Sequence, residues 1–341
     1  MMRRLVACAV LSAGVFMPLV ATAQDFAALF REINPSVVVV RAKGREVTAA
    51  RGVGQFSETG SGVLISADGK VMTAAHVVHS MDEISVEFLG GERIAARIVE
   101  SEPAADLSLL QLERVPAGAK VARLGDSDRV LVGDQVVVVG APYGLSYSLS
   151  IGWISARWQP NTVYRAIPLA EFFQTNATIN TGNSGGPMFT TSGEVIGIVS
   201  HIISKSGGSE GLGFVVTLRT ARELLLEKKS VWGGIDGMML TGDLAEIFNV
   251  PGGVGYLIKT VAKNSPAWKA GVLGGDRTAT IQGQEIVVHG DVILEIAGIR
   301  VKSVEDLTAI REKLGTMPPG TPMTFSVLRA GKVVELTGTL P

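Results

Sequence analysis

Short runs of apolar residues, separated by glycine, proline and polar clusters, fill the chain from residue 36 to residue 216. In order they read SVVVVRA, GVLIS, ISVEFL, RIAARIVE, LSLLQL, QVVVVGA, EVIGIVSHII and LGFVV. Runs of this length at close spacing, with no long helix between them, predict β-strands of a sandwich, a barrel or a pair of barrels. Helices are predicted at both ends of this region, over residues 25–33 and over residues 217–229 with Thr217 as the cap.

The pattern changes after a short linker, SVWGG, that begins at Ser230. It predicts a strand at GYLIKTV, a short helical turn at SPAWKAG, a strand at DVILEIAG, a helix at SVEDLTAIREKL with Ser303 as its cap, and a hairpin turning at Ala330 and Gly331. Mixed helices and strands set this unit apart from the first. We therefore expect a mainly β domain over residues 24–229 and a small α+β domain over residues 230–341.

The first 23 residues are expected to be a secretory signal peptide that is removed. Two arginines precede an apolar core from residue 5 to residue 20, and ATA at residues 21–23 supplies the small residues of a cleavage site. An uncleaved membrane anchor is one alternative, but about 16 apolar residues interrupted by Pro18 are fewer than the roughly 20 that span a bilayer. A lipoprotein site at Cys8 is another, although only three apolar residues precede it. Cleavage after Ala23 is favoured, and no stable membrane insertion is expected.

Composition narrows the class of partner and the compartment. The 341 residues suffice for about two globular domains, and a formal net charge of −1 gives no reason to expect nucleic acid or an anionic membrane as the main partner. Cys8 is the only cysteine, so the exported chain would hold together by core packing without disulfides. With the signal peptide, this indicates a bacterial periplasm.

Four histidines are available as a general base, at positions 76, 79, 201 and 289. His76 ends a β run in VMTAAHVV, whereas His79 lies in a more polar stretch and is expected to be solvated. Asp106 precedes the apolar run LSLLQL, which would draw its carboxylate inward, and Ser184 lies among glycines in TGNSGGPM. Each residue alone is more often structural. Together, His76, Asp106 and Ser184 supply a base, an orienting acid and a nucleophile.

The glycines around Ser184 have a physical role in this interpretation. Acyl transfer develops negative charge on the carbonyl oxygen of the substrate, and the N–H groups of Gly182 and Ser184 could stabilise that charge. Glycine permits the required backbone path without a Cβ clash. The loop is therefore expected to form an oxyanion hole as well as to carry a nucleophile.

These residues resemble those of trypsin-like serine proteases, through TAAHVV, DLSLL and GNSGGP in that order. The longer segments GSGVLISADGKVMTAAHVV, QTNATINTGNSGGPM, GEVIGIVSHI and SGGSEGLGFVV resemble the HtrA (Deg) family of bacterial envelope proteases, and the resemblance extends from Asp25 to the C-terminus. It implies a double β-barrel with His76 as general base, Asp106 as orienter and Ser184 as nucleophile, and with the Gly182 and Ser184 amides as oxyanion hole. It further implies an endopeptidase of misfolded or tagged envelope proteins that needs no cofactor.

The same resemblance suggests a specificity pocket. IVSHI would line one wall of the pocket for the residue before the scissile bond, and Thr178 with the following isoleucine would lie near its floor. No acidic residue occurs there, and Ile202 favours a small aliphatic substrate side chain. Ser200 is expected to contact Asp106, and His201 could flank bound peptide, with an incidental exposed histidine as the alternative.

The second unit resembles a PDZ domain of the HtrA kind. WGGI, formed by Trp232, Gly233, Gly234 and Ile235, matches the loop whose amides hold the terminal carboxylate of a peptide, and the adjoining strand would pair with that peptide. An ordinary linker strand is the alternative. Residues 275–290 are an insertion that is expected to lie away from the peptide groove. The implied partners are unfolded proteins and C-terminal peptides.

Two positions depart from the family pattern. Asn176 stands where many relatives have aspartate, and Thr181 stands where many have proline before the oxyanion glycine. Threonine frees φ and restores an N–H, so this loop is expected to convert more readily between active and inactive forms.

The resemblance also bears on the assembly of the chain, and one alternative function remains. The family forms trimers through an aromatic-bearing N-terminal segment, so a homotrimer or a multiple of trimers is expected, with Phe26 and Phe30 as candidates for that contact or for core packing. The rival function is a catalytically silent chaperone or peptide-sensing scaffold, which the intact His76, Asp106 and Ser184 disfavour. The histidines and the cysteine suggest no metal site.

Overall fold

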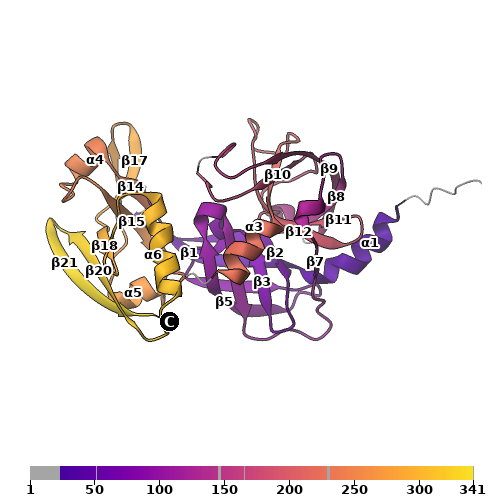
Figure 1. The fold of residues 1–341 in the computed structure, drawn as a ribbon, viewed down its shortest axis with the longest axis horizontal. Helices are drawn as coiled ribbons and strands as arrows, with labels where there is room; N and C mark the ends of the chain where they lie inside the picture. Colours follow the sequence, from indigo (N-terminus) through magenta and orange to yellow (C-terminus); the bar gives the residue numbers. More distant parts are fainter. Residues whose placement is uncertain (1–23, 51, 145–146, 165, 229–230, 341) are drawn as a thin grey trace, which may run out of the picture.

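The structure is a computed structural model that describes residues 24–50, 52–144, 147–164, 166–228 and 231–340, so the expected signal peptide lies outside the described residues. Two units lie side by side: a pair of β-barrels, and a smaller domain that carries the yellow C-terminal strands (Figure 1). Helix α1 (Phe26–Ile33) lies at the end of the molecule remote from the smaller domain (Figure 1). Asp25 caps this predicted helix by accepting a hydrogen bond from the amide of Ala28.

Six antiparallel strands close the first barrel, in the order β1, β2, β3, β6, β5, β4. Their bounds are β1 Val37–Thr48, β2 Gly52–Leu64, β3 Lys70–Thr73, β4 Glu83–Glu87, β5 Arg93–Glu102 and β6 Leu107–Leu112. Four consecutive valines of β1 are buried because alternate side chains face different cores. Val38 and Val40 face the interior of this barrel, whereas Val37 packs into the core between the two barrels.

The second barrel closes through pairing of β11 with β12, and the predicted mainly β architecture with paired barrels is confirmed. Its strands are β8 Gln135–Gly140, β9 Ser148–Trp158, β10 Phe172–Thr175, β11 Pro187–Thr190, β12 Glu194–Ile202 and β13 Gly213–Thr217, with β7 Arg123–Leu124 added in parallel to β12. A β-bulge interrupts β12 between Val199 and His201. Thr217 caps α3 (Leu218–Arg222) as predicted, and the segment Glu223–Glu227 continues it as a π-helix.

The smaller domain has a sheet with strand order β14, β15, β18, β20, β21, in which β19 pairs with β18. Its elements are β14 Ile235–Leu240, α4 Gly242–Ile247, β15 Gly255–Val261, α5 Pro266–Ala270, β18 Val292–Ile296, β19 Ile299–Arg300, α6 Val304–Gly315, β20 Pro322–Arg329 and β21 Lys332–Thr339. Ser303 forms a capping box with Asp306 at the start of α6, at the cap position that the sequence predicts. Strand β14 lies at one edge of the sheet.

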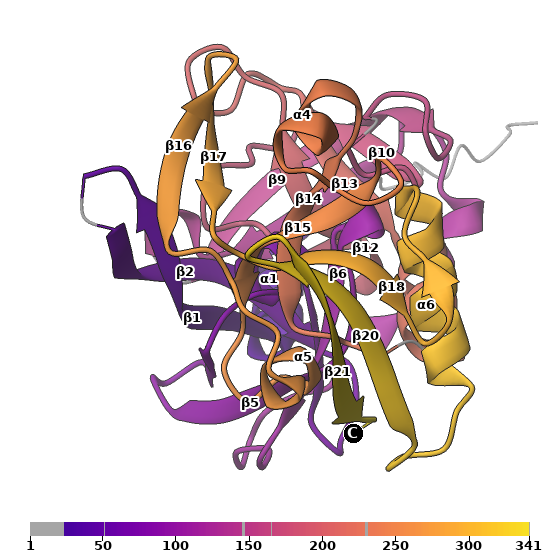
Figure 2. The same cartoon turned by 90° about the vertical axis from the view of Figure 1, so that its left-hand side faces the viewer.

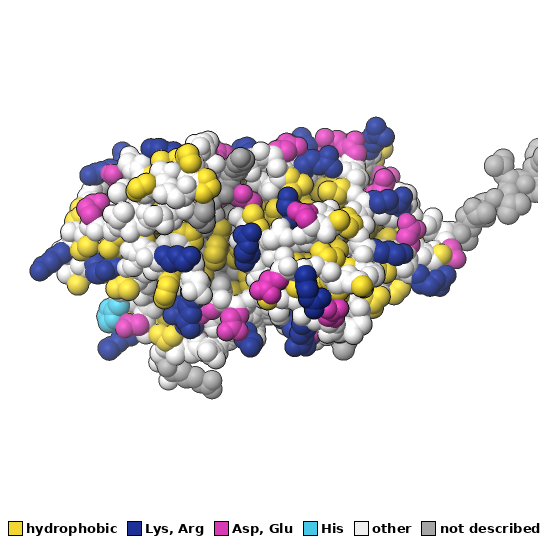
Figure 3. Space-filling view, turned by 90° about the horizontal axis from the view of Figure 1, so that it is seen from below, with side chains coloured by type: hydrophobic (Ala, Val, Ile, Leu, Met, Phe, Trp, Pro, Cys, Tyr) yellow, Lys and Arg dark blue, Asp and Glu magenta, His cyan; other side chains and the backbone are white. Residues whose placement is uncertain are grey.

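The segment at 275–290 forms a separate hairpin of β16 (Arg277–Ile281) and β17 (Gln284–Val288). The hairpin lies beside β1 and β2 of the first barrel, so the insertion bridges the two domains (Figure 2). On the face seen in Figure 3, basic and acidic side chains are interspersed, in keeping with a net charge near zero. Within the described part of the chain, no helix is both long and apolar enough to span a bilayer.

Candidate active site

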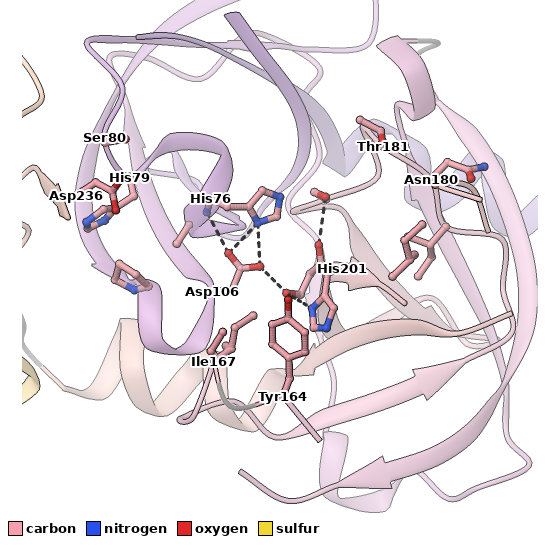
Figure 4. Close-up of a pocket in the computed structure, with 18 residues that line it drawn as sticks. His76, His79, Ser80, Asp106, Tyr164, Ile167, Asn180, Thr181, His201 and Asp236 are labelled. Carbon is pink, nitrogen blue, oxygen red and sulfur yellow. Dashed lines mark hydrogen bonds and ion pairs between the residues drawn. The ribbon is translucent and has the colours of Figure 1, made fainter. Parts of the chain in front are cut away.

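His76 lies in α2 (Ala75–Val78), a single helical turn that follows β3, and Asp106 holds it from below. Asp106 ends the 3-10 turn η2 (Pro103–Ala105) in a left-handed conformation with φ of 55°. Its carboxylate accepts hydrogen bonds from Nδ1 of His76 at 2.9 and 3.0 Å and from the His76 amide at 3.0 Å (Figure 4). The ring and backbone of His76 are therefore both fixed by one carboxylate.

The electrostatics of the pair favour an ionised Asp106 and make His76 more basic. Burial raises the pKa of Asp106, but its hydrogen bonds with His76 and Ser200 outweigh burial and lower the pKa below its usual value. Burial lowers the pKa of His76, but the Asp106 hydrogen bond and charge outweigh it and raise the pKa above 6.5. Because the carboxylate can only accept, Nδ1 of His76 carries the proton and Nε2 keeps its lone pair when the ring is neutral.

Ser184 follows a tight turn whose geometry is set by glycine. The amide of Asn183 donates to the carbonyl of Asn180 at 3.0 Å, and Gly182 has φ of +100°, which at the third position of a four-residue turn defines type II. The Thr181 carbonyl accepts from the Tyr143 amide at 2.8 Å. In a trans peptide the next N–H points the opposite way, so the Gly182 amide is directed away from Tyr143.

Ser61, on β2 of the first barrel, holds this turn from the opposite side. Its hydroxyl donates to the Gly182 carbonyl at 2.7 Å and accepts from the Ala141 amide at 2.9 Å. Its own amide donates to the carbonyl of Ser184 at 2.8 Å. A side chain at position 182 would overlap the carbonyl oxygen of Ala141, so only glycine fits there.

The hydroxyl of Ser184 has a partner other than His76 in this state. Ser184 Oγ donates to the carbonyl oxygen of Ser200 at 3.2 Å, and among the described residues no hydrogen bond joins it to His76. The two side chains nevertheless line the same cleft. A rotation about the Cα–Cβ bond of Ser184 can redirect the hydroxyl, and in unliganded sites such contacts are often loose.

Ser200 contacts Asp106, as expected, at the oxygen Oδ2 that also lies 3.0 Å from Nδ1 of His76. Its hydroxyl donates to Oδ2 at 2.5 Å. His201 is half-buried and packs against Tyr164, Phe172 and Phe214, so the alternative of an incidental exposed histidine does not hold. Figure 4 shows the rings of His201 and Tyr164 next to one another, to the lower right of Asp106.

A cleft of about 670 Å³ brings these groups together. Its lining includes His76, Asp106, Ser184, Ser200, His201, Ile202, Ile179 and Tyr164. Of the two residues expected near the floor, Ile179 is buried and lines the cleft, whereas Thr178 is exposed and does not line it. The one-residue difference follows from backbone direction, since successive side chains of extended chain point to opposite sides.

A second, more apolar groove of about 300 Å³ lies between β14 and α6. It is lined by side chains of the smaller domain, including Ile235, Met238, Leu307, Ile310 and Phe325, and on the facing side by His79, Ser101, Pro103, Ala104 and Ala166. No residue of the β16–β17 hairpin lines it, in keeping with the expectation for the insertion. The loop before β14 turns inward, since the carbonyl groups of Gly233 and Gly234 accept from the amides of Ala267 and Ala262.

The expectation that His79 is solvated was wrong. Its Nε2 donates to the carbonyl oxygen of Ile235 at 2.9 Å, and its Nδ1 accepts from the Ser101 hydroxyl at 2.8 Å. Trp232, expected to lie in a linker, packs against the first barrel and donates from its indole to the His79 carbonyl at 2.8 Å. Burial lowers the pKa of His79 to about 4, so the ring is neutral near pH 7.

A second link joins α6 to the turn that carries Asp106. Arg311 donates to the buried carboxylate of Glu102 at 2.6 Å. Glu102 also caps η2 by accepting from the amide of Ala104 at 3.1 Å. Both walls of the second groove are thus bonded to backbone segments that hold His76 or Asp106.

Asn176, one of the departures from the family pattern, and the aromatic candidates Phe26 and Phe30 lie outside the cleft. Asn176 is exposed and accepts from the Trp153 amide at 2.8 Å, where β9 and β10 shift register, and it does not line the cleft. Phe26 and Phe30 are partly buried against the core between the barrels. Over the described ranges, no three His, Cys, Asp or Glu side chains are grouped so that they could hold a metal ion.

Comparison with known proteins agrees with this geometry. Residues 60–198 match the model of the trypsin-like peptidase domain, and residues 234–340 match that of the PDZ domain. Solved structures of the HtrA-type protease AlgW are similar over 93% of this chain: the complex with a tripeptide has 29% identity, a TM-score of 0.54 and 98% of its own chain covered. The complex with a decapeptide has 26% identity, a TM-score of 0.52 and 99% covered.

Curated relatives carry the name probable periplasmic serine endoprotease DegP-like. The protein of Ectopseudomonas mendocina is 34% identical over 275 residues, which is 76% of this chain and 56% of the relative. That of Pseudomonas putida is 36% identical over 260 residues, 74% of this chain and 53% of the relative. A protein of Chlamydia trachomatis is 34% identical over 289 residues, 82% of this chain and 53% of the relative. The chain thus spans about half the length of the curated relatives it matches.

Proposed function

Since the chain belongs to the HtrA/Deg family of serine proteases, with a trypsin-like peptidase domain followed by one PDZ domain, we propose that it is a serine endopeptidase of misfolded or tagged envelope proteins. The observation that carries the proposal is the placement of Ser184, His76 and Asp106 on one cleft, with both oxygens of Asp106 bonded to His76. The proposed domain limits are residues 24–229 for the protease and 230–341 for the PDZ domain.

In the proposed reaction, Ser184 Oγ attacks the carbonyl carbon of the substrate. Its hydroxyl first turns from the Ser200 carbonyl toward Nε2 of His76, which takes the proton and later gives it to the leaving amine. Asp106 keeps the ring in the Nδ1–H tautomer and stabilises the imidazolium that forms. The amides of Gly182 and Ser184 donate to the developing oxyanion, and water then cleaves the acyl-enzyme by the same groups.

The cleft favours a small aliphatic side chain before the scissile bond. Ile179 and Ile202 line it beside Ser184, and neither carries charge. A lysine or arginine placed against Ile179 and Ile202 would be desolvated by apolar side chains that offer it no compensating partner. Discrimination between aliphatic side chains that differ by one methylene would be about 10- to 200-fold.

Regulation through the second groove is the proposed role of the PDZ domain. The edge position of β14 permits a peptide to add as a further strand, and the amides of the loop formed by Trp232, Gly233, Gly234 and Ile235 are the proposed carboxylate site. Because His79 and Glu102 line or flank this groove and hold the segments of His76 and Asp106, a peptide that enters it alters contacts made to the triad.

Export and assembly belong to the same proposal. Residues 1–23 would direct export to the periplasm, the compartment named for its relatives, and would then be removed. The N-terminal helix with Phe26 and Phe30 lies at the free end of the protease domain, where it is available to a trimer contact (Figure 1).

Degradation of casein tests the proposal directly. Wild-type protein is expected to degrade it, Ser184→Ala is expected to lose this activity, and Ser192→Ala, a change at an exposed serine on the β11–β12 turn, is expected to retain it. Equal residual activity in wild type and Ser184→Ala would overturn the peptidase assignment. Suppression of the aggregation of an unfolded protein by both forms, without cleavage, would favour the rival chaperone function.

A further inference from the structure

Ser200 and His201 are neighbours on β12 beside Asp106, and their side chains lie on the same side of the strand. Successive side chains of a regular strand lie on opposite faces, yet His201 Nδ1 lies 3.1 Å from Ser200 Oγ. The β-bulge between Val199 and His201 explains this contact, because an extra residue in one strand re-aims the side chains beside it. Ser200 and His201 can therefore act together on Asp106.

The direction of each hydrogen bond follows from the number of protons available. Ser200 has one hydroxyl hydrogen, and its oxygen lies 2.5 Å from Oδ2 of the ionised Asp106, which can only accept. The hydroxyl therefore donates to Asp106. The remaining contact requires Nδ1–H of His201 to donate to Ser200 Oγ, which fixes the tautomer of His201.

Three aromatic rings hold the His201 ring in place. Phe214 stacks on it at 5.1 Å with an interplanar angle of 8°, Tyr164 lies at 4.3 Å, and Phe172 meets it edge-on at 5.4 Å. Nε2 of His201 is buried and has no hydrogen-bond partner in the described part of the chain. Burial lowers the pKa of His201 to about 4, so the ring is neutral at pH 7. The contact with Ser200 is thus the one polar contact of this ring among the residues described.

We propose that His201 is a positioning residue that acts on Asp106 through Ser200. Its Nδ1–H keeps the Ser200 hydroxyl in the donating orientation, and the hydroxyl holds Oδ2 so that the carboxylate faces Nδ1 of His76. Hydrogen bonds in such a buried chain polarise one another and reinforce this alignment. His201 touches no reacting atom, and no proton moves along the chain. The inference rests on the proposed peptidase function of Ser184.

Two substitutions at position 201 separate the hydrogen bond from the packing. His201→Phe keeps an aromatic ring between Tyr164 and Phe214 but removes the donor. His201→Asn removes the ring but keeps an N–H near the place of Nδ1. Because one hydrogen bond has a modest net worth, His201→Phe is expected to lower kcat about threefold to tenfold with KM unchanged, and His201→Asn is expected to stay within about twofold of wild type.

A double-mutant cycle with Ser200→Ala tests whether His201 acts through Ser200. The substrate is a quenched fluorescent peptide with valine before the scissile bond. If His201 acts through Ser200, His201→Phe is expected to cause no further loss of kcat in the Ser200→Ala background. An unchanged kcat in His201→Phe, or an equal loss with and without Ser200, would overturn the proposal.

A spectroscopic readout keeps this test separate from that of the proposed function. The Nδ1 proton of His76 is followed by NMR in protein with nitrogen-15-labelled histidine, with Ser184→Ala as the reference for peptidase activity. His201→Phe is expected to shift this resonance, and His201→Asn is expected to leave it near its wild-type position. If Ser184-dependent turnover is absent, the proposed function fails, and an unshifted resonance in His201→Phe overturns the positioning role on its own.

Discussion

His79 Nε2 donates a hydrogen bond of 2.9 Å to the carbonyl oxygen of Ile235, which links the residue three positions after His76 to the edge strand of the other domain. In an antiparallel ladder the N–H and C=O groups of one residue point to the same side. Because the Ile235 carbonyl faces His79 and not β15, both groups of Ile235 face the open edge of β14. A peptide that adds to this edge and His79 therefore compete for one acceptor.

Removal of His79 is expected to strengthen peptide binding. His79→Ala frees the Ile235 carbonyl, so the affinity for a C-terminal peptide should rise about threefold to tenfold, the net worth of one hydrogen bond. His79→Gln, which keeps a donor near Nε2, should bind as wild type does. Fluorescence anisotropy with a labelled peptide, in the Ser184→Ala background to prevent cleavage, measures the affinity. His289→Ala, at the exposed position that follows β17, is the matched control, and equal affinity in both alanine variants contradicts the competition.

A proline at position 181 is expected to raise basal peptidase activity. Proline suits the second position of a type II turn, and the Thr181 amide makes no hydrogen bond among the described residues. Restricting φ lowers the entropy of the unformed loop by an amount worth about 0.4–1 kcal/mol, so basal turnover in Thr181→Pro should rise about twofold to fivefold. Thr181→Val, which leaves φ free, is the control. Unchanged basal turnover in the proline variant counts against a loop that converts between active and inactive forms.

Glu171 is expected to contribute to resistance against acid unfolding. Burial raises the pKa of its side chain, but hydrogen bonds from Arg157 and Arg219 outweigh burial and lower the pKa from 4.5 to about 2. A lowered folded-state pKa gives stability that is present above pH 4.5 and is lost as the pH falls toward 2. Glu171→Gln should therefore flatten the dependence of the unfolding free energy on pH in this window, and should lower it at pH 7 by about 3 kcal/mol because two arginines lose their charged partner.

Chemical denaturation between pH 2 and pH 7 measures this contribution. Glu194→Gln, at a surface position of the β11–β12 hairpin, is the matched control. An unaltered pH dependence in Glu171→Gln would show that other carboxylates determine acid stability.

The pH profile of kcat/KM is expected to report His76. The ring must be neutral to accept the Ser184 proton. Burial is the largest single influence on its pKa and lowers it, but the hydrogen bond and the charge of Asp106 together outweigh burial, so the pKa lies above 6.5. Activity should rise with pH and reach half its maximum above pH 6.5. Asp106→Asn should lower kcat by about 10⁴-fold, because the amide cannot hold the same tautomer. Asp134→Asn, at an exposed loop aspartate, should keep both the rate and the midpoint, and a midpoint below pH 6.5 in wild type contradicts the assignment of the base.

Local sequence patterns predicted most of the architecture and the members of the site. Strands with continuous or alternating apolar residues, such as β1 and β8, were identified, because burial on one or both faces leaves that pattern in the chain. Strand β9 was missed, since its mixed and partly exposed side chains resemble those of a loop. The proposed triad was found because Ser184 lies among glycines, His76 and Asp106 adjoin apolar runs, and the three motifs in this order resemble those of trypsin-like serine proteases.

The features that the sequence did not predict depend on contacts between segments that are far apart in the chain. His79 and Ile235 are 156 positions apart, and nothing in the polar stretch around His79 indicates that another domain covers it. The bulge in β12 has no glycine to mark it, so the shared side of Ser200 and His201 was not predictable from alternation. Both Thr178 and Ile179 were expected near the pocket floor, and only Ile179 lines the cleft, because neighbouring side chains here face opposite sides of the backbone.

The three hydrogen bonds that join Ser61 to the second barrel have a consequence for the chain before it is fully folded. Ser61 belongs to one barrel, and the turn that it holds, at Gly182 and Ser184, belongs to the other. Neither barrel alone can assemble the turn, so hydrolytic competence begins only when both have folded and docked. A chain in which only one barrel has folded is thereby prevented from cutting itself or its unfolded neighbours.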